Sequence, residues 1–153
     1  MKRIFKGRVV FAQKTKGKAL VTHQGFNTLA SFYESLVKKS KRAVCSDQDN
    51  PDLYKKSLTN KIICLPRSIG STSAGATWEA VAERKIAPKA LLFSEQIDSL
   101  AAGGIILAAL WIGLPIVAVD QLGREFLASV RDGQEIEIDE DGTVEVLEVR
   151  PRT

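Results

Sequence analysis

Residues 66–75, PRSIGSTSAG, hold the densest group of side chains that could do chemistry in this chain. Arg67 and Gly70 precede a run of small residues, which let a ligand approach the backbone. The amino-terminal end of a following helix favours negative charge, so the segment predicts a site for a carboxylate, a phosphate or a developing oxyanion. The simpler alternative is that one hydroxyl caps the helix and the glycines only turn the chain. The hydroxyl-bearing residues of the segment are Ser68, Ser71, Thr72 and Ser73.

A second segment, residues 25–28 (GFNT), offers Asn27 and Thr28 as hydrogen-bonding groups. These two side chains could contact a ligand from the opposite side of a cleft, or they could form an Asx-type cap on a turn. The only histidine, His23, lies just past an expected strand. A structural or solvated role for this histidine is favoured over acid–base chemistry.

Four further residues are interpreted as structural. Cys45 and Cys64 read as buried small hydrophobic residues, because Cys64 lies within the apolar run KIICL. Asp98 and Asp120 each adjoin an apolar element and are interpreted as caps, although Asp120 follows a strand and could instead face a cleft.

The elements around residues 66–75 alternate between short apolar runs and helical periodicity. Buried strands are predicted over 61–65, 90–93 and 116–119, and helices over 76–84 and 98–111. This alternation indicates parallel strands joined by helical crossovers. In sheets of this kind ligands bind at the carboxyl ends of the strands, which is where residues 66–75 are expected.

The two ends of the chain are predicted to be rich in strands, so the whole of residues 1–153 is expected to form a single α/β domain with mixed sheets. The expected elements are strands at 4–11 and 18–22 that pair with each other, a helix or a loop with one helical turn at 25–41, an exposed loop at 46–60, a short helix or turn after Asp120, and a hairpin of 134–138 with 143–147.

The net charge of +4 hides an uneven distribution. Residues 1–61 hold 14 Lys and Arg against 4 Asp and Glu, whereas residues 62–153 hold 8 against 14. A basic half fits a solvated face, an anionic substrate or an acidic partner subunit. Nucleic acid is not expected as a partner, because no zinc-finger, RNP-type or KH-type pattern occurs and the aromatic residues are not interleaved with the basic ones.

Residues 100–119 carry no charge over 20 positions, which is the length of a membrane span. However, Gly103-Gly104 and the run Gly113-Leu-Pro115 interrupt the segment, and the following IVAV is typical of a buried strand. A buried helix, a turn and a strand are therefore expected, and no membrane segment. The amino terminus lacks a secretory signal and the two cysteines lack a metal-binding pattern, so a cytoplasmic location is expected.

Three runs of this sequence resemble the small subunit, or swivel domain, of the aconitase X family: LPRSIGSTSAGATWEA at 65–80, IAPKALLFSE at 86–95 and GLPIVAVD at 113–120. The resemblance covers most of the chain and implies a swivelling β/β/α domain with a central βαβαβ unit and β-rich termini. Family members pair this domain with an aconitase-like large subunit that carries the iron site. The resemblance thus implies a hydro-lyase subunit that is inactive without its large subunit.

The resemblance also assigns roles to individual residues. In aconitase-like swivel domains, the serine that follows a glycine in this loop removes the proton α to the substrate carboxylate, and Ser71 follows Gly70 here. The general aconitase pattern has an arginine two residues after this base, where Ser73 stands, so carboxylate recognition passes to Arg67 or to the partner subunit. This chain is expected to bind no metal, and the large subunit is expected to hold an iron or iron–sulfur centre. The residues expected to bind the small carboxylate substrate are Arg67, Gly70, Thr72, Ser73, Asn27 and Thr28.

Two substrates are associated with the family, cis-3-hydroxy-L-proline in bacteria and mevalonate 5-phosphate in archaea. Residues 26–31, FNTLAS, stand where the members that act on mevalonate 5-phosphate have a Gly-Gly-containing loop. This departure favours cis-3-hydroxy-L-proline as the substrate. The alternatives are mevalonate 5-phosphate and, from another class, a non-catalytic anion-binding module.

Overall fold

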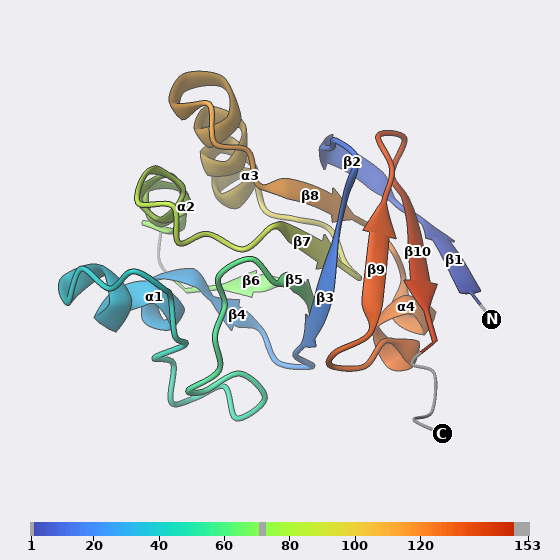
Figure 1. Ribbon diagram of the computed structural model, residues 1–153, viewed down its shortest axis with the longest axis horizontal. Coiled ribbons are helices and arrows are strands. Elements are labelled where there is room, and N and C mark those ends of the chain that lie inside the picture. Colours follow the sequence, from blue (N-terminus) through green and yellow to red (C-terminus); the bar gives the residue numbers. More distant parts are fainter. Residues whose placement is uncertain (1, 71–72, 149–153) are drawn as a thin grey trace.

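The computed structural model describes residues 2–70 and 73–148. Helices α1, α2 and α3 cover one side of a large curved sheet, and α4 lies near β9 and β10 (Figure 1). In chain order the elements are β1 (Lys2–Lys6), β2 (Arg8–Phe11), β3 (Thr15–Val21), β4 (Phe26–Asn27), α1 (Thr28–Val37), β5 (Ile62–Leu65), β6 (Ser68–Ile69), α2 (Ala74–Glu83), β7 (Ala90–Phe93), α3 (Ser99–Leu107), the π-helical turn η1 (Ala108–Ile112), β8 (Val117–Asp120), α4 (Arg124–Ser129), β9 (Glu135–Ile138) and β10 (Thr143–Leu147).

The centre of the fold is the unit β5–α2–β7–α3–β8, which confirms the predicted βαβαβ arrangement. Strand β7 pairs in parallel with β5 on one side and with β8 on the other. Strand β3 pairs in parallel with the free side of β5. All four strands therefore point their carboxyl ends to the same edge of the sheet, and each of α1, α2 and α3 begins after one of these ends.

The large sheet has the strand order β1-β10-β9-β3-β5-β7-β8-β2. Only Gly7 separates β1 from β2, so the two ends of this order belong to one bent stretch of chain. A Cβ at Gly7 would collide with the carbonyl oxygen of Asp120 and would lie 2.7 Å from a methyl group of Val119, so this approach requires glycine. The bend lets β1 pair with β10 while β2 pairs with β8.

The expectation that residues 4–11 form one strand paired with residues 18–22 is therefore wrong. The segment is divided at Gly7, and β3 lies between β9 and β5. An apolar run shows that a strand is present, but its neighbour is decided by the rest of the fold. The predicted hairpin near the carboxyl terminus is confirmed, because β9 and β10 pair antiparallel.

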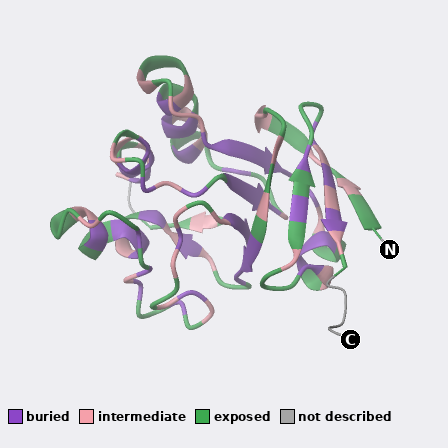
Figure 2. Cartoon of the chain, viewed as in Figure 1, coloured by how far each residue is buried: buried purple, intermediate pink, exposed green. Residues whose placement is uncertain are grey.

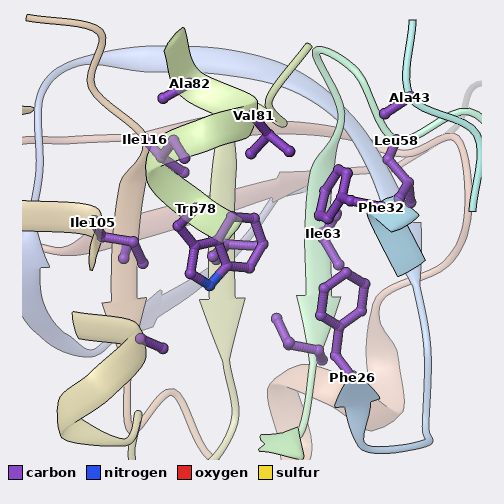
Figure 3. Packing of buried hydrophobic residues seen from close by; sticks show 14 of the residues in the cluster. Phe26, Phe32, Ala43, Leu58, Ile63, Trp78, Val81, Ala82, Ile105 and Ile116 are labelled. Carbon is purple, nitrogen blue, oxygen red and sulfur yellow. The ribbon is translucent and has the colours of Figure 1, made fainter. Parts of the chain in front are cut away.

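Two apolar cores lie on the two sides of the parallel strands, and buried residues follow the strands and the inner faces of the helices (Figure 2). The first core lies beneath α1, α2 and α3 and centres on Trp78 of α2. The Trp78 ring stacks on Phe26, with centroids 6.0 Å apart and planes at 13°, and meets Phe32 edge-on at 5.4 Å (Figure 3). The second core fills the curved part of the sheet and includes Phe126 and Leu127 of α4.

The structure decides several predictions about individual segments. Residues 25–41 contain the helix α1, and not merely a loop. The expectation that residues 46–60 form an exposed loop is wrong in part, because Leu53 and Leu58 are fully buried in the first core. Residues 100–119 form helix, turn and strand as expected, with Gly113 ending η1 at a φ of 73°. Among the described residues, no helix has the length and apolar character needed to cross a membrane.

Candidate active site

The two segments that the sequence singled out lie side by side. Strands β4 and β6 form a separate two-stranded parallel sheet in which Asn27 is opposite Ile69. The Phe26 N–H donates to the Arg67 carbonyl at 2.8 Å. Gly70 adopts a φ of 106°, and a Cβ there would lie 2.9 Å from the Asn27 side chain. The backbone of one segment thus closely approaches the side chain of the other, and this approach requires glycine at position 70.

Three helices begin at this edge of the sheet. Asn27 is the N-cap of α1, where its Oδ1 accepts from the Ala30 N–H at 3.1 Å, so the cap alternative holds for this oxygen. Ser73 occupies the N-cap position of α2. Asp98 caps α3 by accepting from the Ala101 N–H at 2.9 Å, which confirms its predicted role. The positive ends of three helix dipoles therefore face the same edge. The Asp98 carboxylate already offsets the dipole of α3, so additional negative charge is favoured mainly at the starts of α1 and α2.

Buried polar atoms without partners gather near this edge. Thr28 Oγ1, Ser68 Oγ and Trp78 Nε1 are all buried and have no hydrogen-bond partner within the described part of the chain. Figure 3 shows the Trp78 nitrogen pointing toward the carboxyl ends of the neighbouring strands. Since buried polar groups in proteins are nearly always paired, these three atoms indicate a place for water or for a polar ligand.

Arg67, predicted to bind an anion, is exposed and forms an ion pair with Glu95 in the loop after β7. The distance from Arg67 Nη1 to Glu95 Oε2 is 3.0 Å. The Glu95 backbone N–H donates to the Pro66 carbonyl at 3.2 Å, and the Gln121 N–H donates to the Glu95 carbonyl at 3.0 Å. The loops after β5, β7 and β8 are thus joined at this edge. An exposed pair of this kind contributes little to stability, so the guanidinium can exchange Glu95 for another anion.

The base expected from the family resemblance, Ser71, and the neighbouring Thr72 lie outside the described residues. The residues on either side of them border the site, because Gly70 approaches the Asn27 side chain and Ser73 is the N-cap residue of α2. The other residues expected to bind substrate lie around the β4–β6 pair: Asn27 is in β4, Thr28 begins α1, Arg67 and Gly70 flank β6, and Ser73 is the N-cap residue of α2.

Three other titratable residues were considered from the sequence: His23, Cys45 and Cys64. His23 is exposed, and its backbone N–H donates to the Asp52 carboxylate at 2.8 Å. Cys45 and Cys64 are buried, which confirms their interpretation as small core residues. Burial raises the pKa of both thiols, so neither is suited to act as a nucleophile.

The interpretation of Asp120 as a cap is wrong. Its fully buried carboxylate accepts from Arg8 Nε at 3.0 Å, from Arg8 Nη2 at 2.7 Å and from the Ile97 N–H at 2.8 Å. The hydrogen bonds between Arg8 and Asp120, together with the charge of Asp120, raise the pKa of the Arg8 guanidinium. Asp120 thereby ties β2 to β8 and holds the loop that leads into α3.

Sequence reasoning missed two residues of the site. Glu95 carried a signal that could have been used, since it follows the carboxyl end of a predicted parallel strand. Ser68 was noted only as one hydroxyl among several, and its burial depends on the pairing of β4 with β6. The described residues contain no group of three His, Cys, Asp or Glu that could hold a metal ion.

A large open cavity of about 1040 Å³ lies elsewhere, between β1, β10 and α4. Its lining includes both cations and anions, among them Arg3, Arg131 and Glu125. It includes no residue of β4 or β6 and none of the three helix starts described above. The candidate site is therefore an exposed edge in the isolated chain, and the wide cavity is a separate surface feature.

Comparison with known proteins gives a consistent result. The family model described as the aconitase X swivel domain matches residues 4–146. A curated phosphomevalonate dehydratase small subunit from Thermococcus sibiricus is 31% identical over 144 residues, which cover 94% of this chain and 98% of that protein. A second protein of the same name, from Aeropyrum pernix, is 36% identical over 92 residues, covering 60% of this chain and 64% of that protein.

Two solved structures share the fold. The holo-form of Thermococcus kodakaraensis aconitase X matches with a TM-score of 0.80 and 23% identity, covering 95% of this chain and 99% of that one. A solution NMR structure of a UPF0107 protein matches with a TM-score of 0.77 and 22% identity, covering 95% of this chain and 100% of that one. These matches confirm the predicted swivel-domain architecture.

Proposed function

The chain belongs to the aconitase X swivel-domain family and is the small subunit of an aconitase X-type dehydratase, and we propose that it completes the active site for dehydration of mevalonate 5-phosphate. The substrate is supported by the curated relatives, several of which match over 94% of this chain and are named phosphomevalonate dehydratase small subunits. This substrate replaces cis-3-hydroxy-L-proline as the better supported of the two.

The observation that carries the proposal is the pairing of β4 with β6. It brings the start of α1 beside Gly70, which directly precedes Ser71 in the sequence. Mevalonate 5-phosphate has a carboxylate at one end, a phosphate at the other and a hydroxyl on the carbon β to the carboxylate. An edge with the uncharged helix starts of α1 and α2 and with unpaired buried donors suits a substrate with two anionic groups.

Ser71 acts in this proposal as the base. It takes the proton from the carbon α to the carboxylate, the electrons of that C–H bond form a carbon–carbon double bond, and the C–O bond breaks. The hydroxyl group leaves as water after it gains a proton. A serine hydroxyl is a weak base, so its alkoxide form must be stabilised by N–H donors and positive potential at the helix start. Arg67 releases Glu95 and pairs with an anionic group of the substrate.

An iron or iron–sulfur centre does not fit this chain, because its described residues offer no set of three metal ligands. We place that centre in the larger subunit, where it would supply Lewis-acid chemistry. The residues of this chain are restricted to removing the proton and binding the substrate.

The test uses the chain coexpressed with the aconitase-like larger subunit from the same genome. Turnover of mevalonate 5-phosphate and of cis-3-hydroxy-L-proline is followed by NMR, and the Ser71→Ala complex is expected to lose at least ~100-fold in kcat. Ser129→Ala is the matched control, since the Ser129 hydroxyl bonds the Phe126 carbonyl in α4, far from the site. Wild-type rates in the assembled Ser71→Ala complex would exclude Ser71 as the base.

The second candidate substrate, cis-3-hydroxy-L-proline, is favoured by one specific observation. Residues 26–31 lack the Gly-Gly loop that the family resemblance leads us to expect in members that act on mevalonate 5-phosphate, and Phe26 and Thr28 of this segment are fully buried. Turnover of cis-3-hydroxy-L-proline alone in the same assay would establish this substrate instead. Tight binding of substrate anions without turnover of either would support a non-catalytic anion-binding module.

A further inference from the structure

We propose that the larger subunit docks on an apolar rim around the candidate active site, formed by Leu29, Ile69 and Leu100. The proposal rests on the proposed function, because that function supplies the larger subunit as the occupant. It goes further by assigning the surface on which the two subunits meet.

The three rim residues come from three different elements that border the site. Leu29 lies in the first turn of α1, Ile69 lies in β6 directly before Gly70, and Leu100 lies in the first turn of α3. They are 37%, 47% and 50% exposed in the isolated chain. Three partly exposed aliphatic side chains therefore lie at one edge of the sheet, next to the polar residues of the candidate site.

Close packing against two glycines, through the Leu100 backbone and the Ile69 side chain, holds two of these residues close to the site. A Cβ at Gly75, in the first turn of α2, would lie 2.9 Å from the Leu100 carbonyl oxygen. A Cβ at Gly25, just before β4, would lie 2.6 Å from Ile69 Cγ2. The rim thus follows the starts of α1, α2 and α3, and the exposure of its side chains does not come from a loose loop.

A second surface must cover this edge for the chemistry to proceed. Arg67 and Gly70 are exposed in the isolated chain. Water at the site would weaken each electrostatic interaction on which proton removal from carbon depends. The larger subunit is the surface that must reach this edge, because the substrate reacts between the two chains. A contact that covers the site continues directly onto Leu29, Ile69 and Leu100.

The composition of the edge matches the anatomy of a protein–protein interface. Such interfaces have an apolar centre with a polar, partly solvated periphery. Here the apolar residues adjoin the Arg67–Glu95 ion pair and the exposed Asp98. These charged groups can lie at the periphery of the contact, where they keep some hydration and help to set its orientation.

The experiment compares charged variants of the rim with a matched control. Leu29→Asp and Leu100→Asp each place a carboxylate in the first turn of a helix, where it favours helix formation, so both variants are expected to fold. Ile69→Thr is paired with Ile4→Thr, because Ile4 lies in β1, away from the three helices, and is 64% exposed. Thermal unfolding of each isolated variant verifies its fold, and calorimetry measures its Kd for the purified larger subunit.

Each Asp variant is expected to raise the Kd at least ~10-fold, as for a residue near the centre of an interface, and Ile4→Thr is expected to leave it within about twofold. The neutral variants Leu29→Ser and Leu100→Ser separate loss of apolar contact from electrostatic repulsion, and they should also weaken binding. An unchanged Kd in all the rim variants, with normal binding of the wild-type chain, would overturn the docking proposal and leave the proposed function standing.

A different apolar surface provides a competing outcome. Leu110 and Trp111 of η1 are 73% and 85% exposed, and they lie roughly 15–17 Å along the helix from Leu100 at ~1.5 Å per residue. Loss of binding on Trp111→Ser but not on the rim variants would overturn the rim in favour of this surface. Self-association abolished by the rim variants would show instead that a second copy of this chain covers the rim. Failure of the wild-type chain to bind any aconitase-like larger subunit would overturn the proposed function itself.

Discussion

Gly104→Ala should disturb the contact that sets the spacing of α2 and α3. A Cβ at Gly104 would lie 2.5 Å from the carbonyl oxygen of Gly75 and 2.6 Å from its Cα, whereas a Cβ at Gly103 would meet nothing within 4 Å. Both glycines lie inside α3, so they share the same intrinsic cost of glycine in a helix. Gly103→Ala is therefore a control that differs from the test variant mainly in the contact with α2.

The magnitude follows from two opposing effects. Replacing glycine by alanine within a helix stabilises it by ~0.5–1 kcal/mol, and Gly103→Ala should show this gain. Gly104→Ala has the same gain, but its methyl group is roughly 1 Å too close to backbone atoms that cannot rotate away. Overpacking typically costs ~1–3 kcal/mol, and a backbone collision belongs at the upper end of this range. Gly104→Ala should therefore lower the free energy of unfolding by ~2 kcal/mol.

Thermal and urea denaturation of the isolated chain measure this difference. The two variants should differ by ~3 kcal/mol, which corresponds to roughly 6–12 °C in Tm for a chain of this size. In the assembled enzyme Gly104→Ala should also lower turnover, because Gly75 lies in the first turn of α2, four residues after the proposed base in the sequence. A Tm for Gly104→Ala at or above that of Gly103→Ala would refute the reasoning that α2 and α3 need this close approach.

Three other predictions concern single residues. Asp120→Ala should lower the free energy of unfolding in urea by at least ~1–3 kcal/mol, because the buried Ile97 N–H loses its acceptor; an unchanged midpoint would contradict this. Gly70→Ala should reduce turnover at least ~10-fold, since the positive φ costs ~1–2 kcal/mol and the Cβ would press on Asn27; normal turnover would show that the loop tolerates the methyl group. Cys64 should not react with a disulfide reagent at pH 8 in the native protein and should react after unfolding in urea, because burial raises the pKa of its thiol; rapid native labelling would indicate that β5 opens.

The sequence was most informative where structure depends on local pattern. Strands β5, β7 and β8 are buried on both faces, so each appears as a continuous apolar run between turns. The partners of β1 and β2 could not be inferred in this way, because they depend on a bend at Gly7, which packs against β8 and donates to the Gly142 carbonyl. Strands β4 and β6 have two residues each. Their pairing depends on a long-range contact, the hydrogen bond from the Phe26 N–H to the Arg67 carbonyl, between residues 41 positions apart.

In the candidate site, too, individual residues could be predicted from the sequence, but their contacts could not. Asn27 was predicted from the hydrogen-bonding capacity of its side chain, and Gly70 was predicted because glycine in a loop lets a ligand approach the backbone. Their proximity could not be found in this way, because it depends on the parallel pairing of two strands too short to be recognised. The role of Asn27 Oδ1 as a helix cap was one of two open alternatives, and only the position of the Ala30 N–H decides between them.

The positive character of the site has an unexpected origin. The basic amino-terminal half suggested that Lys and Arg side chains would attract an anion, yet residues 22–31, 66–80 and 94–104 include a single Lys or Arg, Arg67. Glu95 balances its charge at 3.0 Å. Asp98 adds a negative charge at the start of α3. The attraction for an anion therefore comes mainly from the starts of α1 and α2, and peptide dipoles act strongly only where water is excluded. A chain that binds its substrate in this way gains most of its affinity when another surface covers the edge. In our proposal the larger subunit provides that surface by docking on the apolar rim.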